Sequence, residues 1–153
     1  MLFNFRKYYP SHDENLMKHE GDVEYAREYF FKNQNSNLRY LLEKRYNWMN
    51  KFILPEDKCV IELGSGAGFS KYYINHKILL SDYKKYSWID LVIDANNIQL
   101  EPNSVDVFIC SHMIHHVSNP VTFLENLSTY LKPNGKIIIQ EIYTSVIMKL
   151  LLL

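Results

Sequence analysis

Short apolar runs recur along the chain after its first third, and each has the length of a buried β-strand. Runs of this kind, bounded by turn-forming or charged residues, are typical of strands that are covered on both faces. Because the stretches between them suit helices or crossover loops, we predict an α/β fold with a parallel sheet of about five strands. The predicted strands are residues 59–63, 77–82, 90–95, 105–111 and 137–142.

The first third of the chain favours helices instead. Residues 23–32 form a short helical candidate, and residues 38–52 place large apolar side chains on one broad face before Pro55 ends the pattern. We therefore predict an N-terminal helical extension or cap over residues 1–54 and a sheet domain over residues 55–153.

Further helices are predicted between and after the strands. A polar cap and a proline in the first turn mark the start of one of them, and residues 131–136 are typical of a turn. The predicted helices cover residues 69–75, 120–131 and 145–153.

The apolar stripe of residues 38–52 has two readings. Such a stripe most often faces a core, and we interpret it mainly in that way. The alternative is that Tyr40, Tyr46 or Trp48 lines a pocket for a substrate.

Composition narrows the class of protein. The 153 residues contain 17 Lys and Arg and 17 Asp and Glu, so the formal net charge is zero. This balance gives no electrostatic reason to expect nucleic acid or an anionic membrane as a partner. The four leucines that end the sequence are far too few to cross a bilayer, which needs about 20 apolar residues.

The cysteines and the N-terminus favour a cytoplasmic protein. Cys59 and Cys110 fall in predicted strands, where free cysteines behave as small apolar residues. The first residues lack the apolar core of a signal peptide.

Three alternating glycines follow the first predicted strand, at Gly64, Gly66 and Gly68, with Glu62 on the strand just before them. Glycine allows a sharp turn and lets a ligand approach the backbone, and a strand, such a turn and a following helix together bind the polar end of nucleotide-like ligands. The dinucleotide fingerprint would require a glycine where Phe69 stands. This spacing disfavours a nicotinamide oxidoreductase.

An acid ends the second predicted strand. Asp82 lies 18 positions after Gly64 (82 − 64 = 18), close to the roughly 20-residue offset at which an acid meets a ribose in nucleotide-binding folds. A carboxylate can accept from both ribose hydroxyls. The alternative is an aspartate that only caps its loop.

These features together resemble the class I S-adenosylmethionine-dependent methyltransferases, whose first motif has the pattern Glu-x-Gly-x-Gly-x-Gly. The resemblance covers about residues 38–145. It implies a Rossmann-like sheet in the order 3-2-1-4-5 with helices on both faces. The segments that carry it are residues 60–68, Asp82, residues 94–95, residues 104–107, residues 115–117 and residues 130–136.

The resemblance also implies the cofactor and its site. In such enzymes an acid after the third strand holds the adenine amino group and the next backbone N–H holds a ring nitrogen, which matches Asp94 and Ala95 here. The subset that the chain is most similar to acts on small molecules, some of them in saccharide or lipid pathways. The residues expected to bind S-adenosylmethionine are Glu62, Gly64, Ser65, Gly66, Gly68, Asp82, Asp94, Ala95 and Ser111.

The sequence departs from the family at its end. The family sheet closes with an antiparallel hairpin, and this sequence stops after the fifth predicted strand. We therefore expect an incomplete domain whose fifth strand exposes an unpaired edge, a template for homo-oligomer formation.

Two histidines follow the fourth predicted strand. An oxygen acceptor would need a base, and His115 or His116 is suited to that role by type. The alternative is a histidine pair that only shapes the turn. No cysteine and histidine cluster has the spacing of a zinc site, and we predict no metal.

The function predicted from the sequence is methyl transfer from S-adenosylmethionine to a small molecule. The alternative is a fragment or partner subunit that binds the cofactor without turnover.

Overall fold

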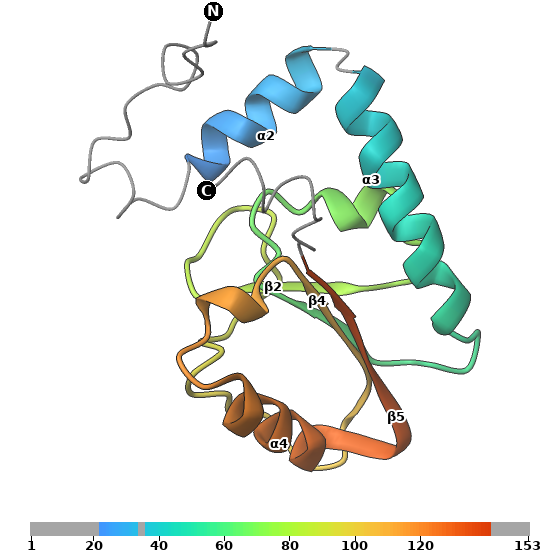
Figure 1. Ribbon diagram of the computed structural model, residues 1–153, viewed down its shortest axis with the longest axis vertical. Helices are drawn as coiled ribbons and strands as arrows, with labels where there is room; N and C mark the ends of the chain where they lie inside the picture. The colour runs from blue at the N-terminus through green and yellow to red at the C-terminus, as the bar shows by residue number, and fades with distance from the viewer. Residues whose placement is uncertain (1–21, 34–35, 142–153) are drawn as a thin grey trace, which may run out of the picture. The chain divides into compact units, whose positions relative to one another are not determined.

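The computed structural model describes residues 22–33 and 36–141, and its centre is a five-stranded sheet (Figure 1). All described strand pairs are parallel, in the order β3-β2-β1-β4-β5. This order confirms the prediction, and the described residues contain no closing hairpin. The strands are β1 (Val60–Leu63), β2 (Leu79–Asp82), β3 (Leu91–Val92), β4 (Val105–Ser111) and β5 (Leu131–Gln140).

One face of the sheet packs against α4 (Pro120–Tyr130). Side chains alternate between the faces of a strand, so Ile61 and Phe108, which pair laterally, point to the same side. They join Phe123 and Leu127 of α4 in one buried apolar cluster. Asn119 caps this helix, because its side chain accepts a hydrogen bond from the Thr122 N–H at 3.2 Å.

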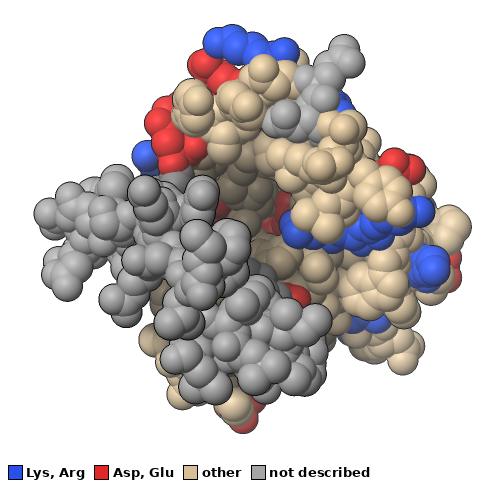
Figure 2. Space-filling view, turned by 45° about the horizontal axis from the view of Figure 1, so that its top comes forward, with Lys and Arg blue, Asp and Glu red and all other residues tan. Residues whose placement is uncertain are grey.

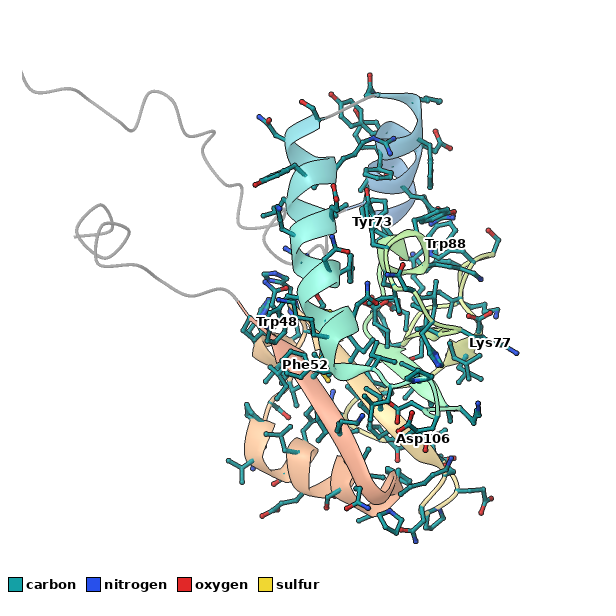
Figure 3. The ribbon with its side chains drawn as sticks, turned by 90° about the vertical axis from the view of Figure 1, so that its right-hand side faces the viewer. Trp48, Phe52, Tyr73, Lys77, Trp88 and Asp106 are labelled. Atoms are coloured by element: carbon teal, nitrogen blue, oxygen red, sulfur yellow. The ribbon has the colours of Figure 1, made fainter. Side chains whose placement is uncertain are left out.

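The opposite face is crossed by α3 (Ser36–Met49), which continues into the short 3-10 helix η2 (Asn50–Phe52). Leu42, Tyr46 and Met49 are its buried side chains. In Figure 3 this helix runs along the sheet, with Trp48 and Phe52 near its lower end. Glu62 of β1 points to this second face, so the two sides of the sheet differ in polarity.

The chain divides into two compact units, residues 1–34 and residues 35–153. The first contains α2 (Val23–Lys32), which Asp22 caps by accepting from the Tyr25 N–H at 2.9 Å. This division differs from the boundary expected after residue 54, because α3 buries apolar side chains within the second unit.

Two predicted elements take another form. The helix predicted over residues 69–75 is only the 3-10 turn η3 (Phe69–Tyr72), which starts from the left-handed Gly68 and ends where the Tyr73 N–H returns to Ser70. The turn predicted over residues 131–136 belongs to β5 as an irregularity. There Val105 pairs with Leu131 and Val107 with Lys136. The helix predicted over residues 145–153 lies outside the described residues.

A carboxylate joins the starts of three strands at the end of the sheet opposite the glycine turn. Oδ2 of Asp106 accepts from the N–H groups of Lys58 and Cys59, at 3.0 and 2.8 Å, and from Nζ of Lys132 at 2.7 Å. Burial raises the pKa of Asp106, but the hydrogen bonds from Lys132, Cys59 and Lys58 outweigh it and hold the pKa below its ordinary value.

We expect Asp106→Ala to lower the free energy of unfolding by about 1.5–3 kcal/mol, because charged hydrogen bonds of this kind are lost. Asp106 has a lowered pKa in the folded state, so its stabilisation is present above the unfolded pKa of about 3.9 and disappears as the pH falls through the folded value. Urea denaturation from pH 3 to pH 7 measures this. Glu101→Ala, at an exposed position, is the control. If the free energies of unfolding of wild type and Asp106→Ala differed by the same amount at all pH values, the stabilising role of the ionised Asp106 would be contradicted.

Candidate functional site

The glycine turn borders open space at the carboxyl end of β1. Gly64, Gly66 and Gly68 all have positive φ, at 67°, 49° and 67°. An added Cβ at Gly64 would lie 3.0 Å from Met113, and one at Gly68 would lie 2.8 Å from Trp88. At Gly66 it would meet nothing within 4 Å. Two of the glycines therefore allow close packing, and Gly66 presents its backbone to a space that a ligand can fill.

Asp82 ties the end of β2 to this turn. Its Oδ2 accepts from the Gly66 N–H at 2.9 Å, and its Oδ1 accepts from the Lys84 N–H at 3.2 Å. The residue is buried. The structure thus brings Asp82 to the turn and shows the loop-capping contacts that the alternative reading required. A carboxylate accepts about four hydrogen bonds, so these two contacts leave capacity for ribose hydroxyls.

Serines and a tryptophan hold the turn from other directions. Ser81 Oγ donates to the Glu62 carbonyl at 2.7 Å, and the Ser65 N–H donates to the Ser81 carbonyl at 2.8 Å. Trp88 Nε1 donates to the Gly66 carbonyl at 2.8 Å, and Trp88 is labelled in Figure 3. The conformation of the turn is therefore fixed by the folded chain itself.

Glu62 lies beneath the turn and is almost completely buried. Its carboxylate accepts a hydrogen bond from Ser70 Oγ. Burial raises its pKa to about 7, although the hydrogen bonds of Ser70 and Ser65 and the charge of Arg45 act in the opposite direction. In this position Glu62 supports the turn from inside the domain.

Asp94 and Ala95 follow β3 at the same edge of the sheet. Asp94 is exposed, and its Oδ1 accepts from the Asn96 N–H at 2.8 Å. Ala95 faces a cavity of about 120 Å³ between this loop and the start of α4. The cavity is lined by Ala95, Asn96, Val117, Ser118, Asn119, Thr122, Phe123 and Asn126.

Ser111, at the end of β4, belongs to a polar cluster under α3. Its Oγ donates to Gln140 Oε1 at 3.4 Å and also hydrogen-bonds the hydroxyl of Tyr46. Burial and then the charge of Glu62 raise the pKa of Tyr46 above its ordinary value, although Arg45 and Ser111 hydrogen-bond its hydroxyl. Sequence reasoning listed Tyr46 only as one candidate for a pocket and did not assign Arg45 or Gln140.

His115 pairs with the carboxylate of Glu141, which directly follows β5. Its Nδ1 lies 2.7 Å from Oε2 of Glu141, whose other oxygen accepts from the Ile114 N–H at 2.7 Å. Burial raises the pKa of Glu141, but the hydrogen bonds from His115 and Ile114 hold it below its ordinary value. The rings of His115 and His116 are 4.1 Å apart in the 3-10 turn η4 (Ile114–His116). Glu141 was missed, although it follows the apolar run of a predicted strand.

The described surface and helices add two observations. In Figure 2, acidic and basic side chains are interspersed over the visible face, which fits the zero net charge. In the described part of the chain, no helix combines the length and apolar character that crossing a membrane requires.

Comparison with known families identifies the class of protein. Residues 61–139, just over half of the chain, match the family model described as a methyltransferase domain. The chain therefore belongs to the methyltransferase domain family.

Individual proteins are similar to parts of this chain. Over 66 residues it is 38% identical to the highly reducing polyketide synthase PKS6 of Gibberella zeae, a match that covers 41% of this chain and 3% of that protein. The YcgJ protein from Bacillus subtilis has a TM-score of 0.53 at 18% identity, covering 64% of this chain and 50% of that one. The CurJ carbon methyltransferase has the same score and identity, covering 69% and 35%.

The YcgJ and CurJ structures share their fold with this chain. The chain spans half or less of the length of each of these three proteins.

The raised pKa of Glu62 gives a testable pH dependence. Between the ordinary value of 4.5 and the folded value of about 7, the folded protein binds a proton that the unfolded chain has lost. Ionisation of Glu62 therefore makes the free energy of unfolding fall as the pH rises through this window. In Glu62→Gln this fall in the free energy of unfolding with rising pH should be absent. Urea denaturation from pH 5 to pH 8 measures it. Glu101→Gln is the exposed control, and an unchanged slope in Glu62→Gln would contradict the assignment.

Proposed function

We propose that this methyltransferase uses S-adenosylmethionine to methylate a small molecule. The observation that carries the proposal is the open space at Gly66 with the Asp82 carboxylate beside it, where the central strands end. A backbone without a side chain and a carboxylate with spare acceptor capacity suit a nucleoside that carries a flexible polar tail.

Each group of the proposed residues binds a different part of the cofactor. Asp82 accepts from the ribose hydroxyls, Asp94 and the Ala95 N–H hold the adenine, and the cavity beside Ala95 gives the ring room. Gly64, Ser65, Gly66 and Gly68 carry the amino-acid end, with Glu62 and Ser111 behind them. When bound, S-adenosylmethionine supplies a methyl group on a sulfonium, which is strongly electrophilic.

The chain's own base is the His115–Glu141 pair. Glu141 accepts the Nδ1 proton of His115, and this contact leaves Nε2 as the acceptor of the neutral ring. A histidine held in this way can take a proton from an O–H, N–H or acidic C–H group as its lone pair attacks. His116 lies beside it and is the second candidate.

The acceptor that we propose carries a carbonyl group next to the methylated atom. The match to a polyketide synthase over 66 residues supports this class, since a polyketide chain is extended through β-keto intermediates. A small polar acceptor also fits the balanced charge of the chain, which favours no polyanion.

Three further expectations stay predictions. The alternative function is cofactor binding without turnover, by a fragment or partner subunit. Association through the outer edge of β5, and a cytoplasmic location, are likewise untested. Binding of the cofactor with no turnover on any acceptor would favour the alternative.

We expect Asp82→Ala to weaken S-adenosylmethionine binding by about 1.5–3 kcal/mol, the usual worth of hydrogen bonds to a charged group. Isothermal titration calorimetry measures this, and NAD should give no signal. Glu101→Ala is the matched control for loss of a carboxylate. Unchanged affinity in folded Asp82→Ala would reduce Asp82 to a loop cap, and binding of NAD alone would overturn the proposed cofactor.

We expect His115→Ala to lower kcat by about 10²–10⁴-fold, the typical contribution of a general base, with cofactor affinity unchanged. Transfer of a labelled methyl group to β-keto thioester and phenol acceptors measures this. His76→Ala, a histidine before the amino end of β2, is the control. Full turnover in His115→Ala together with loss in His116→Ala would move the base to the second histidine.

A further inference from the structure

Two side chains hold the backbone of Gly66, one at its N–H and one at its carbonyl. The N–H donates to Asp82 Oδ2 at 2.9 Å, and the carbonyl accepts from Trp88 Nε1 at 2.8 Å. Gly66 is the second residue of a tight turn, which the Gly68 N–H closes by donating to the Ser65 carbonyl at 2.8 Å. Its φ is 49°, and glycine adopts either sign of φ about equally readily. Several turn conformations are therefore open to Gly66, and the two hydrogen bonds select one of them.

Trp88 is fixed in the position from which it reaches this turn. Its neighbour Ile89 is buried, and the Asp90 N–H donates to the Leu80 carbonyl at 2.9 Å, which ties the loop to β2. The Trp88 ring stacks on Tyr86, with ring centroids 4.9 Å apart and an angle of 6° between the planes. The indole donor is thus held both through its backbone and through its ring.

The third glycine of the motif makes room for this indole. A Cβ added at Gly68 would lie 2.8 Å from Cδ1 of Trp88 and 3.4 Å from its Nε1. Carbon atoms in contact are usually about 3.5–4.0 Å apart, so the ring would have to move. Because Nε1 would move with the ring, a side chain at position 68 would disturb the hydrogen bond to Gly66. The open position in the turn is Gly66, while the space beside Gly68 is filled by Trp88.

We propose that Trp88 is a positioning residue for the amino-acid end of S-adenosylmethionine, because it holds the Gly66 carbonyl and thereby the turn conformation that this end meets. Trp88 acts through the backbone of Gly66 and takes no part in the transfer of the methyl group. A turn that is ordered before the cofactor arrives does not have to be ordered on binding, which favours affinity. The inference rests on the proposed function and adds to its site a residue outside the motifs that carry the family resemblance.

The first test uses the free protein and needs no cofactor. Trp88→Phe keeps an aromatic ring in the loop but removes the Nε1 donor. Deuterium exchange of the Gly66 N–H, followed by nuclear magnetic resonance, should become at least about threefold faster, because its bond to Asp82 opens more often. The amides of β1 should exchange as in wild type. Trp48→Phe, which removes an exposed indole on α3, is the matched control and should change neither rate.

The second test measures binding of S-adenosylhomocysteine by isothermal titration calorimetry. We expect Trp88→Phe to raise its Kd about three- to tenfold, because the variant must first adopt the turn conformation that the indole held. Methylthioadenosine lacks the amino-acid end and should bind wild type and Trp88→Phe equally. Trp48→Phe should leave both dissociation constants unchanged.

A second replacement guards against a folding defect in Trp88→Phe. Benzothienylalanine at position 88 keeps the shape of the bicyclic ring and has sulfur in place of the N–H group. It should reproduce the faster exchange at Gly66 and the weaker binding of S-adenosylhomocysteine, with an unchanged circular dichroism spectrum.

The outcomes separate this proposal from the proposed function. Unchanged exchange at Gly66, or an unchanged Kd for S-adenosylhomocysteine, in both replacements would overturn the role of Trp88 and leave the proposed function standing. An equal loss of affinity for S-adenosylhomocysteine and methylthioadenosine would also overturn it, since the indole would then support the site as a whole. Failure of the proposed function would be seen in wild type itself, which would bind neither ligand, and the role of Trp88 would be overturned with it.

Discussion

The hydrogen bond from the Gly66 N–H to Asp82 is the contact on which the candidate site depends. It closes the gap between the carboxyl ends of β1 and β2, the two strands that position a ligand at this edge of a parallel sheet. The contact requires positive φ at Gly66 and a short acid at the end of β2, and both are present. The space beside Gly66 is open, since an added Cβ there would meet nothing within 4 Å.

The two faces of the sheet differ in the polarity of the side chains buried on them. The α4 face is an apolar cluster that contributes stability. The α3 face contains the buried polar groups Glu62 and Tyr46, whose pKa values burial raises and the charge of the nearby Arg45 lowers. Buried polar groups are costly unless each has a partner.

The sequence predicted those features of the fold that local residue patterns determine. The apolar runs predicted the strands, the family resemblance implied their order, and the alternating glycines predicted a turn with positive φ that the structure shows at all three positions. Sequence reasoning singled out Asp82 by its offset of 18 positions from Gly64, which is close to that of a ribose-binding acid in nucleotide-binding folds. The 3-10 turn after Gly68 was predicted as a helix, since nothing in residues 69–75 marks how early the chain turns back at Tyr73.

Contacts between distant segments were beyond that reasoning. Glu141 meets His115 across 26 positions, only because β5 pairs with β4 in the observed register. Arg45 was read as part of a helical stripe and Tyr46 as one candidate for a pocket, because the period of the stripe shows a face but not which polar residues lie at the ends of the strands.

The most direct measurement is a crystal structure of the chain with S-adenosylhomocysteine. The account predicts ribose hydroxyls within about 3.2 Å of the Asp82 carboxylate, the adenine at the cavity beside Ala95, and the backbone of Gly66 against the ligand. A ligand bound elsewhere, with the glycine turn unchanged and empty, would contradict it.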